Sequence, residues 1–572
     1  MNATTQPWLE HYPSTVPETV QVPDTDVTEP LWTSANRFPQ RDALDFMGVS
    51  TTYTELIDQI ERAITILTSH GVKKGDRVAL ALPNCTTHVV AFYAVLRIGA
   101  IVVEHNPLYT RSELVHQLKD SGAKYAIFWD KTAAELGDGV SGTDVETLFN
   151  VDVSRDLPVV KRLLLKLPVA KARETKAALC AIPPSYAKSW VSLMGQAQAG
   201  LASEPVAAAD DIAVIQYTGG TTGTPKGAVL THRNLVANTV QGTAWTGADQ
   251  NMGTEVVYGV LPFFHAFGLT LCLTYSLRIG ATVVLFPKFD VDQFLAAHKK
   301  RPGTFLPAVP PMLSRLTTRA EEKGADLTSF KIALSGAMPL PQETAEAWER
   351  VTGGLVIEGY GMTESSPVAL GNPVSPDRQP GRLGYPFPST DAIIVDQDDH
   401  TKVLPLTERG ELLVSGPQVF QGYWNRPEEN EHVLVEIDGK TWLRTGDVVV
   451  MDETGSFKVV DRIKEMIITG GFKVFPSQVE EHVREMPEVS DVAIVGVPAG
   501  DLGERVVAAV VPADLGKPVS LKAIQDWCDD KLARYALPRE LVVVEDLPRS
   551  QIGKVLRRVV REQILEGAAA KA

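Results

Sequence analysis

Short apolar runs alternate with amphipathic stretches along most of this chain of 572 residues. Strand-like runs bounded by turn residues lie at 211–218, 281–287, 331–335 and 355–358. Helix-like stretches lie at 291–300 and 341–351, the second ending just before two glycines. This alternation is typical of parallel sheets layered with helices, in which loops at the strand ends carry function. We therefore predict an α/β fold of layered sheets and helices.

The pattern changes near residue 460. Beyond the turn at Thr454-Gly455, Ser477 begins a stretch with the Ser-Gln-Val-Glu spacing of a helix capping box. Strand-like runs follow at 492–498, 506–512 and 541–545, with a helix expected from Leu521. We predict a large N-terminal domain over residues 1–460 and a small α+β domain over residues 461–572.

Composition and charge exclude several classes of protein. Hydrophobic residues make up 44% and charged residues 22%, which is ordinary globular usage and excludes a disordered, collagen-like or coiled-coil chain. The four cysteines lie far apart without a Cys-x-x-Cys pair, so neither a disulfide scaffold nor a cysteine zinc site is expected. A net charge of −15 disfavours nucleic acid as the main partner, because phosphate binding needs a basic face.

Sorting and membrane signals are weak. The N-terminus has no basic segment followed by an apolar one, and the C-terminus carries no sorting address, so we expect a cytoplasmic protein. Residues 256–277 form 22 positions without Asp, Glu, Lys or Arg, enough to span a bilayer. However, Pro262, His265 and two glycines would strand polar groups in lipid. A buried segment with a functional loop is therefore expected there.

One segment reverses the charge of its surroundings. Residues 161–188 contain seven Lys or Arg residues and a single acid, Glu174, interleaved with leucines. Clustered lysines near an anionic membrane contribute about 1 kcal/mol each, and leucines can enter the interface. The segment thus indicates either peripheral membrane contact or a solvated surface excursion. Both interpretations stay open, because the overall negative charge opposes adsorption.

The strongest site signal is the run from Tyr217 to Gly227, which holds four glycines and four threonines and reaches Lys226. Glycines let backbone N–H groups approach an anion closely, and threonine hydroxyls add donors, so phosphate is the natural ligand. The run is not a Walker A motif, because Pro225 precedes the lysine and a glycine follows it. A flexible surface turn is the less favoured alternative.

Four further signals are weaker. A glycine-flanked tyrosine, Tyr360, offers a flat face for a base, and Glu364 follows it as an acid that could hold Mg²⁺. Asp447 follows a Thr-Gly turn and suits ribose hydroxyls. The fourth signal consists of two neighbouring stretches, residues 460–466 and 469–471. The fifth is Lys554, which follows a Ser-Gln-Ile-Gly loop. Taken singly, each is more often a turn, a cap or a solvated charge.

Together and in this order, the five motifs resemble those of the acyl-adenylate-forming (ANL) enzymes: acyl-CoA synthetases, luciferases and peptide-synthetase adenylation domains. The resemblance extends from about residue 30 to residue 566. Three further stretches, at 106–124, 231–235 and 416–428, are similar to those of bacterial long-chain fatty-acid–CoA ligases in particular.

The resemblance implies a ligase that uses ATP and Mg²⁺ to convert a fatty acid to acyl-AMP with release of pyrophosphate. The thiol of coenzyme A then takes the acyl group. Two anions must meet in the first step, so the site has to supply positive charge in the transition state. The resemblance assigns this role to Lys554. It also implies a small domain that is mobile about a hinge at Asp461.

Individual site residues follow from the same resemblance. Thr218 and Glu364 are expected to hold Mg²⁺ and, with Lys554, to be the catalytic residues. The expected contacts with ATP or AMP come from Thr218, Gly219, Gly220, Thr221, Thr222, Gly223, Lys226, Gly336, Ala337, Glu358, Gly359, Tyr360, Gly361, Thr363, Asp447, Arg462 and Lys554. Tyr360 is expected to stack on adenine, Thr363 to contact the α-phosphate, and Asp447 with Arg462 to hold the ribose.

The two remaining substrates have fewer expected contacts. His265 and Gly336 are assigned to the acyl pocket, although without the resemblance a core histidine would be preferred. Amino-acid-activating relatives often have an aspartate near His265, and its absence favours an uncharged acyl chain. Coenzyme A is assigned to Gly470, Gly471, Phe472 and Lys473. Some relatives carry a lysine where this chain has Ile468, so the phosphates of coenzyme A need other partners, Lys473 or Arg505.

Other functions remain as alternatives. An acyl-AMP ligase serving a carrier protein usually has an insertion near the domain junction, whereas Asp447 and Arg462 are only 15 positions apart here. A ligase for another carboxylic acid, such as an aryl acid, is a second alternative. A non-catalytic lipid-binding or uptake protein is a third alternative, but it would be expected to have lost residues of the phosphate loop, Glu364 or Lys554, and none is lost. A simple nucleotide-binding scaffold would leave Lys554 without a role. The sequence leaves chain-length preference and oligomeric state open.

Overall fold

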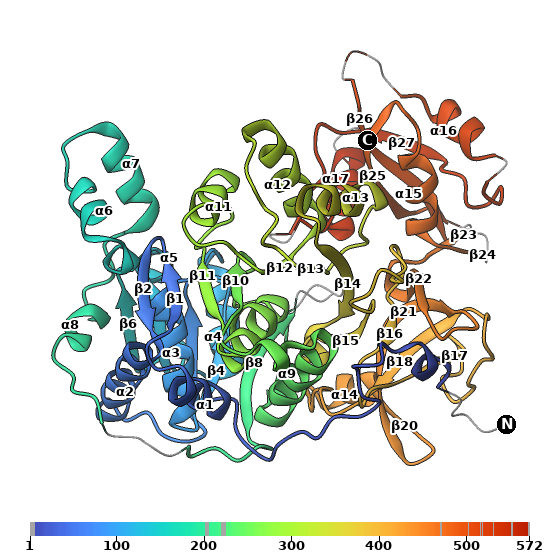
Figure 1. Cartoon of the computed structure of the whole chain (residues 1–572). Helices are drawn as coiled ribbons and strands as arrows, with labels where there is room; N and C mark the ends of the chain where they lie inside the picture. Colours follow the sequence, from blue (N-terminus) through green and yellow to red (C-terminus); the bar gives the residue numbers. More distant parts are fainter. Residues whose placement is uncertain are drawn as a thin grey trace. The chain divides into compact units, whose positions relative to one another are not determined.

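The computed structural model describes residues 6–200, 205–218, 225–469, 472–500, 503–514, 516, 519–529, 531–550 and 553–569. They form two compact units (Figure 1). The large unit consists of Trp8–Asp391 and Val414–Leu443. The small unit consists of Ala392–Leu413 and Arg444–Ala572, with the first seven residues. The domain boundary between residues 460 and 461 stays a prediction.

The large unit contains a nine-stranded sheet with the order β16-β15-β14-β13-β12-β10-β11-β1-β2. Its strands are β1 (Asp42–Phe46), β2 (Val49–Thr52), β10 (Val256–Gly259), β11 (Thr282–Leu285), β12 (Phe305–Ala308), β13 (Ile332–Ser335), β14 (Leu355–Gly361), β15 (Val368–Gly371) and β16 (Tyr385–Pro386). Neighbours from β14 to β1 are parallel, and only the two edges are antiparallel. The predicted parallel sheet is confirmed.

An eight-stranded sheet has the order β19-β9-β8-β4-β3-β5-β6-β7. Its strands are β3 (Arg77–Ala81), β4 (Ile101–Glu104), β5 (Tyr125–Trp129), β6 (Thr147–Val151), β7 (Lys188–Ser189), β8 (Ile212–Thr218), β9 (Lys226–Thr231) and β19 (Gly422–Tyr423). It is parallel from β8 to β7 and antiparallel from β19 to β8. The antiparallel edge therefore carries both ends of the threonine-glycine run.

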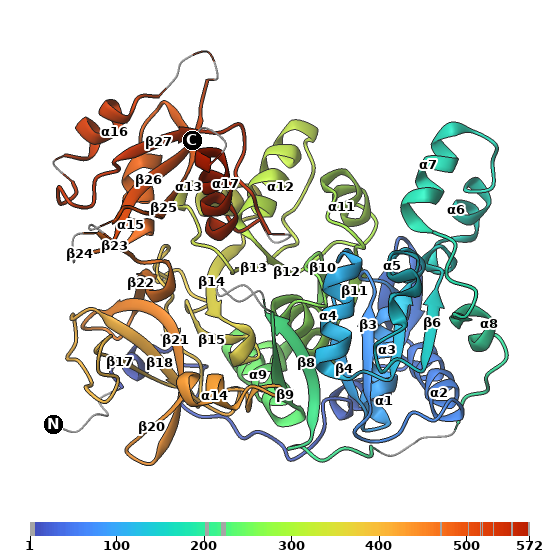
Figure 2. The same ribbon diagram turned by 180° about the vertical axis from the view of Figure 1, so that it is seen from behind.

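Helices cover and separate the two sheets (Figures 1 and 2). Those of the large unit are α1 (Glu29–Arg37), α2 (Tyr53–Ser69), α3 (Thr86–Arg97), α4 (Arg111–Ser121), α5 (Asp130–Leu136), α6 (Val159–Leu164), α7 (Ala170–Leu179), α8 (Trp190–Met194), α9 (His232–Thr246), α10 (Tyr275–Arg278), α11 (Val291–His298), α12 (Pro310–Lys323), α13 (Gln342–Thr352) and α14 (Pro427–Val433). Helix α2 packs on β1 and β2 and α3 packs on β3 and β4, while the two helices contact each other. They therefore form a layer between the sheets, which explains why most of α3 is apolar and buried.

The long uncharged stretch folds as predicted for a buried segment. It forms β10, a loop, a π-helix η5 (Gly268–Thr274) and α10, and its residues are mostly buried. In the part of the chain that the structure describes, no helix is long and apolar enough to cross a bilayer.

Strands β17 (Asp391–Val395), β18 (Gly410–Ser415), β20 (Leu434–Ile437), β21 (Lys440–Met451) and β22 (Phe457–Arg462) form a five-stranded sheet. The small unit adds a two-stranded sheet, β23 (Ile467–Thr469) and β24 (Phe472–Val474), and a three-stranded one, β25 (Val489–Pro498), β26 (Glu504–Pro512) and β27 (Glu540–Val543). Its helices are α15 (Pro476–Arg484), α16 (Leu521–Cys528) and α17 (Arg557–Ala569).

Two apolar cores lie on opposite faces of the three-stranded sheet. Val492 and Ile494 of β25 join a cluster with residues of α15 and α16. Ala493 and Val495 join a second cluster that includes Val560 of α17. Since successive side chains of a strand point to opposite faces, a strand buried on both sides must be apolar throughout. This accounts for the unbroken apolar run at 492–498.

The capping box predicted at the start of α15 is wrong. The helix begins at Pro476, one residue before Ser477, and the residue before it makes no side-chain cap. Instead, Asp461 of β22 accepts a 2.8 Å hydrogen bond from the Ser477 backbone N–H and a 3.3 Å bond from its hydroxyl. A carboxylate from a neighbouring strand thus satisfies the helix N-terminus, which the local spacing could not reveal.

Candidate active site

The threonine-glycine loop is bounded by an antiparallel pair of strands. Thr218 ends β8 and Lys226 begins β9, and the two are partners across the pair. The loop residues Gly219, Gly220, Thr221, Thr222 and Gly223 lie outside the described residues. A hairpin followed by α9 differs from the strand–loop–helix of a Walker A motif, in agreement with the sequence.

Lys226 is the most buried lysine of this region, with 11% of its side chain exposed. Its Nζ lies 2.5 Å from Oε2 of Glu429 on α14, and 5.3 Å from the ring centre of Tyr423. A buried ammonium needs such partners, because an isolated charge away from water is costly. Glu429 therefore balances the lysine beside the loop.

Tyr423 also connects to Glu364, the predicted metal ligand. The Tyr423 hydroxyl donates a 2.5 Å hydrogen bond to Oε1 of Glu364, which is buried in the short 3₁₀-helix η6 (Thr363–Ser365). The backbone N–H of Phe420 donates to the Glu364 carbonyl, 2.9 Å away. Burial and the Glu364 carboxylate both raise the pKa of Tyr423, so its hydroxyl keeps the proton that it donates. Tyr423 thus links Glu364 to Lys226.

The loops after β13 and β14 meet at the carboxyl ends of these parallel strands, where ligands bind in open α/β sheets. Gly336 follows β13, and a Cβ there would lie 3.0 Å from the Phe267 ring. At Gly361 of β14, a Cβ would lie 1.8 Å from the Pro367 carbonyl oxygen, so only glycine fits. Ala337 adopts φ +65°, which is unfavourable for a residue with a Cβ. Tyr360, predicted to stack on adenine, lies between Gly359 and Gly361 on this strand.

Glu358 forms hydrogen bonds with two loops in the same region. Its carboxylate accepts hydrogen bonds from the backbone N–H groups of Leu340, at 3.1 Å, and Gly381, at 2.6 Å. Burial raises the pKa of Glu358 to about 7, although the two N–H donors oppose the shift. Both partners are loop residues, so we interpret Glu358 as a residue that positions the loop after β13.

His265 lies in the loop between β10 and η5. Its Nδ1 accepts a 3.3 Å hydrogen bond from the Phe267 N–H, and burial lowers its pKa to about 4, so the ring is neutral near pH 7. Gln216 of β8 donates a 2.9 Å hydrogen bond to the Phe264 carbonyl, which holds this loop beside the end of β8. Since Phe267 also lies against Gly336, the structure brings together the two residues predicted to line the acyl pocket.

A second group of predicted residues lies within the small unit. Asp447 of β21 and Arg462 of β22 are cross-strand partners, and Arg462 Nε lies 2.9 Å from Oδ1 of Asp447. The Asp447 side chain is 5% exposed, whereas that of Arg462 is 42% exposed. A buried carboxylate with an accessible guanidinium beside it is suited to binding vicinal hydroxyls.

Lys554 lies near this pair. Ser550 accepts a 3.1 Å hydrogen bond from the Lys554 N–H, and its own N–H donates to the Lys554 carbonyl at 2.8 Å. Burial, and then the charge of Arg462, lower the pKa of Lys554 to about 8, while Asp447 opposes the shift. The ammonium is thus present at neutral pH and lost in mild alkali.

Asp461, the predicted hinge, is held in place by its side chain. Besides the two bonds from Ser477, its Oδ1 accepts a 2.7 Å hydrogen bond from the Arg462 N–H. The carboxylate is almost fully buried, and burial raises its pKa. In this conformation Asp461 therefore ties the end of β22 to the start of α15.

The residues predicted for coenzyme A are only partly described, because Gly470 and Gly471 lie outside the described residues. Phe472 of β24 is 54% exposed and stacks on Tyr535 with ring centres 4.6 Å apart. Lys473 Nζ lies 3.2 Å from Asp398, and Arg505 lies 2.8 Å from Glu540. Both basic side chains are thus paired with surface carboxylates.

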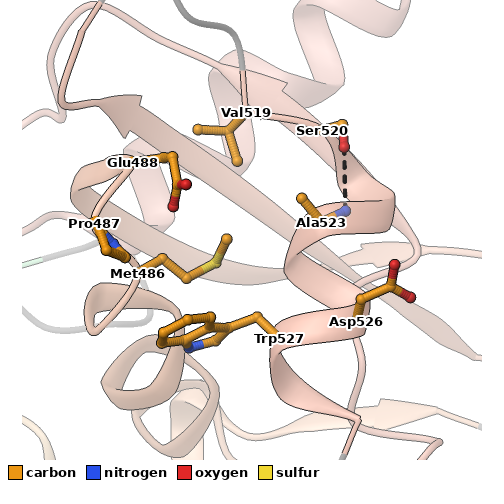
Figure 3. Close-up of a pocket in the computed structure, with 8 residues that line it drawn as sticks. All are labelled: Met486, Pro487, Glu488, Val519, Ser520, Ala523, Asp526 and Trp527. Carbon is orange, nitrogen blue, oxygen red and sulfur yellow. Dashed lines mark hydrogen bonds between the residues drawn. The ribbon is translucent and has the colours of Figure 1, made fainter.

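A cavity of about 570 Å³ lies between α16 and the end of α15 (Figure 3). It is lined by Met486, Pro487, Glu488, Val519, Ser520, Ala523, Asp526 and Trp527. None of these is a predicted site residue, and two are carboxylates that disfavour a phosphate ligand. We do not assign the active site to this cavity.

Three residues that form these hydrogen bonds and ion pairs were assigned no role from the sequence. Tyr423 and Glu429 surround Lys226, and Arg557 forms a bidentate pair with Glu480, at 2.8 and 2.6 Å, and a 3.0 Å bond to Ser477. Tyr423 lies within the stretch at 416–428 that resembles fatty-acid–CoA ligases, and this was its only signal. Nothing in the local sequence singles out Glu429 or Arg557.

Family models match most of the chain. Residues 31–424 match the model described as "AMP-binding enzyme", and residues 478–554 match "AMP-binding enzyme C-terminal domain". The chain belongs to the AMP-binding enzyme family. The predicted family is therefore confirmed, as is the α/β fold with a large N-terminal and a small C-terminal part.

Curated relatives match over almost their full length. "Long-chain-fatty-acid--CoA ligase" of Bacillus subtilis (strain 168) is 38% identical over 562 residues, which are 98% of both chains. The protein of the same name from Salmonella typhimurium is 37% identical over 564 residues, 97% of this chain and 98% of its own. Among solved structures, ATP-bound MatB from Rhodopseudomonas palustris has a TM-score of 0.79 at 29% identity, covering 95% of this chain and 99% of its own. A Mycobacterium tuberculosis fatty acyl CoA synthetase has a TM-score of 0.70 at 28% identity, covering 94% and 98%.

Proposed function

We propose that this enzyme is an ATP-dependent long-chain fatty-acid–CoA ligase. One observation carries the proposal: the chain matches relatives that bear this name over 97–98% of its length. The residues predicted to bind ATP, which form one group in each unit, support the proposal. Lys226, Tyr423 and Glu364 are linked beside the phosphate loop, and Lys554 lies near the Asp447–Arg462 pair.

In the first half-reaction, a carboxylate oxygen of the fatty acid attacks the α-phosphorus of ATP. The bond from that phosphorus to the β-phosphate oxygen breaks, which releases pyrophosphate and leaves acyl-AMP. Thr218, Lys226 and the loop between them bind the phosphates, and Thr363 contacts the α-phosphate. Tyr360 stacks on the base between the loops after β13 and β14, while Asp447 and Arg462 hold the ribose.

Lys554 supplies the positive charge that this step requires, because its ammonium bridges the carboxylate and the α-phosphate. Charge placed in advance where it develops in a transition state contributes several kcal/mol to catalysis. Burial, and then the charge of Arg462, lower the pKa of Lys554 to about 8, so these surroundings disfavour the ammonium form. Such a group gains from an anionic partner.

Mg²⁺ is part of the proposal. The Glu364 carboxylate and the Thr218 hydroxyl are hard oxygen donors, and Mg²⁺ is usually held by one or two carboxylates together with substrate phosphates. When bound, the ion would neutralise the phosphate oxygens of ATP.

The acyl pocket is proposed to lie beside the loop of His265. Its neutral imidazole and the aromatic side chains beside it provide no charge for a substrate ammonium or second carboxylate. An uncharged alkyl chain fits this environment, because burying apolar surface there costs no polar desolvation.

In the second half-reaction, the sulfur of coenzyme A attacks the acyl carbonyl and AMP leaves. Lys554 has no role in this step, and its side chain would occupy space that the thiol needs. We therefore infer that the small domain rotates about Asp461 between the steps. Phe472, Lys473 and the glycines before them would then face the acyl-AMP.

The place of action is the cytoplasm, at the inner face of the membrane. Long-chain fatty acids are poorly soluble in water and collect in bilayers, so an enzyme that contacts the surface meets its substrate there.

Product analysis tests the function directly. With ATP, Mg²⁺ and palmitate but without coenzyme A, bound acyl-AMP should accumulate at about one equivalent per enzyme and no thioester should form. Addition of coenzyme A should convert it to palmitoyl-CoA and AMP. Turnover that requires an acyl-carrier protein, or that occurs with benzoate but with no fatty acid, would instead support one of the alternative ligases.

A further inference from the structure

The basic segment folds as a helical hairpin at the outer edge of the large unit. Helices α6 and α7 lie beyond β6, and both views show them projecting away from the eight-stranded sheet (Figures 1 and 2). The hairpin includes most of the residues between β6 and β7.

The hairpin exposes an unusual amount of apolar surface. Of the eighteen large hydrophobic side chains that are exposed among the described residues, six lie within the eleven positions 159–169. They are Val159, Val160, Leu163, Leu164, Leu167 and Val169, with 47% to 68% of each residue exposed. Ile182, 92% exposed, and Tyr186 follow on the returning chain. Scattered apolar side chains are normal on a protein surface, but such a concentration indicates an interaction site.

Basic side chains surround this apolar surface. Residues 161–188 carry seven Lys or Arg and one Glu, a local charge of +6 in a chain with a net charge of −15. Lys166, Lys171 and Lys176 are exposed. Apolar and basic side chains together match an anionic lipid surface, in which acyl chains lie beneath phosphate groups.

The hairpin is attached firmly at its far end. The Trp129 indole N–H donates a 2.7 Å hydrogen bond to the Leu179 carbonyl, and the Cys180 thiol lies 3.2 Å from Oδ1 of Asp152. At the near end, Lys161 Nζ lies 3.3 Å from the Met47 carbonyl oxygen. The apolar residues are therefore presented on a defined element of the fold.

We propose that the α6–α7 hairpin docks the enzyme on a bilayer containing anionic phospholipids, with Leu163, Leu164 and Leu167 entering the headgroup–acyl boundary. Its lysines contact lipid phosphates. The purpose of the contact, the collection of fatty acid, rests on the proposed function, whereas the binding itself does not depend on catalysis.

Sedimentation with vesicles tests the docking. The protein should bind vesicles of phosphatidylcholine mixed with phosphatidylglycerol, and bind vesicles of phosphatidylcholine alone much more weakly. Binding should fall as salt is added, because exposed charges are screened beyond about 8 Å at physiological ionic strength. Neutralising Lys166, Lys171 and Lys176 to Gln should weaken binding about a hundredfold, since about 1 kcal/mol per charge corresponds to roughly fivefold each.

Matched controls separate the hairpin from general charge and apolarity. Lys119, Lys288 and Lys331 are exposed lysines elsewhere in the large unit, and their triple change to Gln alters net charge equally but should leave binding nearly unchanged. Changing Leu163, Leu164 and Leu167 to Ser should weaken binding about tenfold or more. Leu108→Ser, at a leucine that is 64% exposed outside the segment, should have no effect.

Octanoate activation in free solution provides the check on folding. All variants should retain it, because none of these residues belongs to the site. Vesicle binding that is indifferent to salt and to both hairpin variants would overturn the proposal. So would leucine-dependent self-association in sedimentation velocity without vesicle binding, which would identify a second copy of the chain as the occupant. Intact vesicle binding by a protein without ligase activity would count against the proposed function alone.

Discussion

The Tyr423 hydroxyl donates a 2.5 Å hydrogen bond to the buried carboxylate of Glu364, while its ring lies 5.3 Å from Nζ of Lys226. Tyr423 reaches this position because β19 pairs with β9, which places it opposite Ala228. One side chain thus positions both the proposed metal ligand and the lysine beside the phosphate loop.

Tyr423→Phe should therefore impair adenylation without removing a charged group. Loss of a hydrogen bond to a charged acceptor typically costs about 1.5–3 kcal/mol, so we expect the rate of acyl-AMP formation to fall roughly tenfold or more. The Mg²⁺ concentration for half-maximal rate should rise as well. Tyr12→Phe is the control, since the Tyr12 hydroxyl donates a 2.5 Å bond to the Pro386 carbonyl away from these residues. It should lower stability and leave the Mg²⁺ dependence unchanged.

Glu364→Gln should have a larger effect of the same kind. The amide keeps the size of the side chain but loses the charge that attracts a divalent cation. We expect a higher Mg²⁺ requirement and a slower adenylation, measured as pyrophosphate release across a magnesium titration. If the magnesium dependence equals that of the wild type, Glu364 does not serve the metal.

Much of the fold could be predicted from the sequence, because local patterns determine it. The apolar runs at 211–218 and 331–335 became β8 and β13, and the helix-like stretch at 341–351 became α13 within one residue at each end. The parallel sheets followed from the alternation of strands and helices.

Contacts between distant segments could not be predicted. Tyr423 and Glu364 are 59 positions apart, and Arg557 and Glu480 are 77 apart. The capping box failed for the same reason, because the carboxylate that meets α15 comes from Asp461, 16 positions before Ser477. The site assignments carried by the resemblance stay predictions, although the structure brings several of them together within each unit.

Lys554→Ala should abolish acyl-AMP formation from acid and ATP. Supplied acyl-AMP should still react with coenzyme A, because the lysine belongs to the first transition state only. The expected loss in the first step is several kcal/mol, as for other groups that stabilise transition-state charge. Rapid-quench assays of the two half-reactions measure this difference. An equal fall in both would indicate a structural role.

The pH dependence of the first half-reaction should report the same lysine. The pKa of Lys554 is lowered to about 8, so its ammonium is lost as the pH rises through that value. Adenylation should therefore decline above about pH 8, whereas acyl transfer from supplied acyl-AMP should lack this limb. Lys554→Arg, which keeps its charge to higher pH, should move the decline of any remaining activity upward. If the decline occurs at the same pH in this variant, a group other than Lys554 controls it.

Asp461→Pro tests the hinge. Proline fixes φ near −65° and restricts the preceding Val460, so the rotation between the two half-reactions should be blocked. If the variant is held in the adenylating state, acyl-AMP should form at a near-normal rate while thioester formation collapses. Equal effects on both half-reactions would falsify the hinge assignment.

The side chain of Asp461 requires its own control, because it also binds Ser477. Asp461→Asn keeps the backbone free but weakens the cap on α15, and loss of a helix N-cap costs about 0.5–2 kcal/mol. We expect it to lower the melting temperature while both half-reactions continue. If Asp461→Asn reproduces the selective loss of thioester formation, the side chain and not the backbone controls the second step.

The central claim is that the enzyme activates a fatty acid with ATP and then transfers it to coenzyme A. Pyrophosphate release across a panel of acids from acetate to oleate, with and without coenzyme A, tests it most directly. The account predicts sustained release with long-chain acids only when coenzyme A is present, and a single-turnover burst when it is absent. Sustained release that ignores coenzyme A, or no release with any fatty acid, would contradict it.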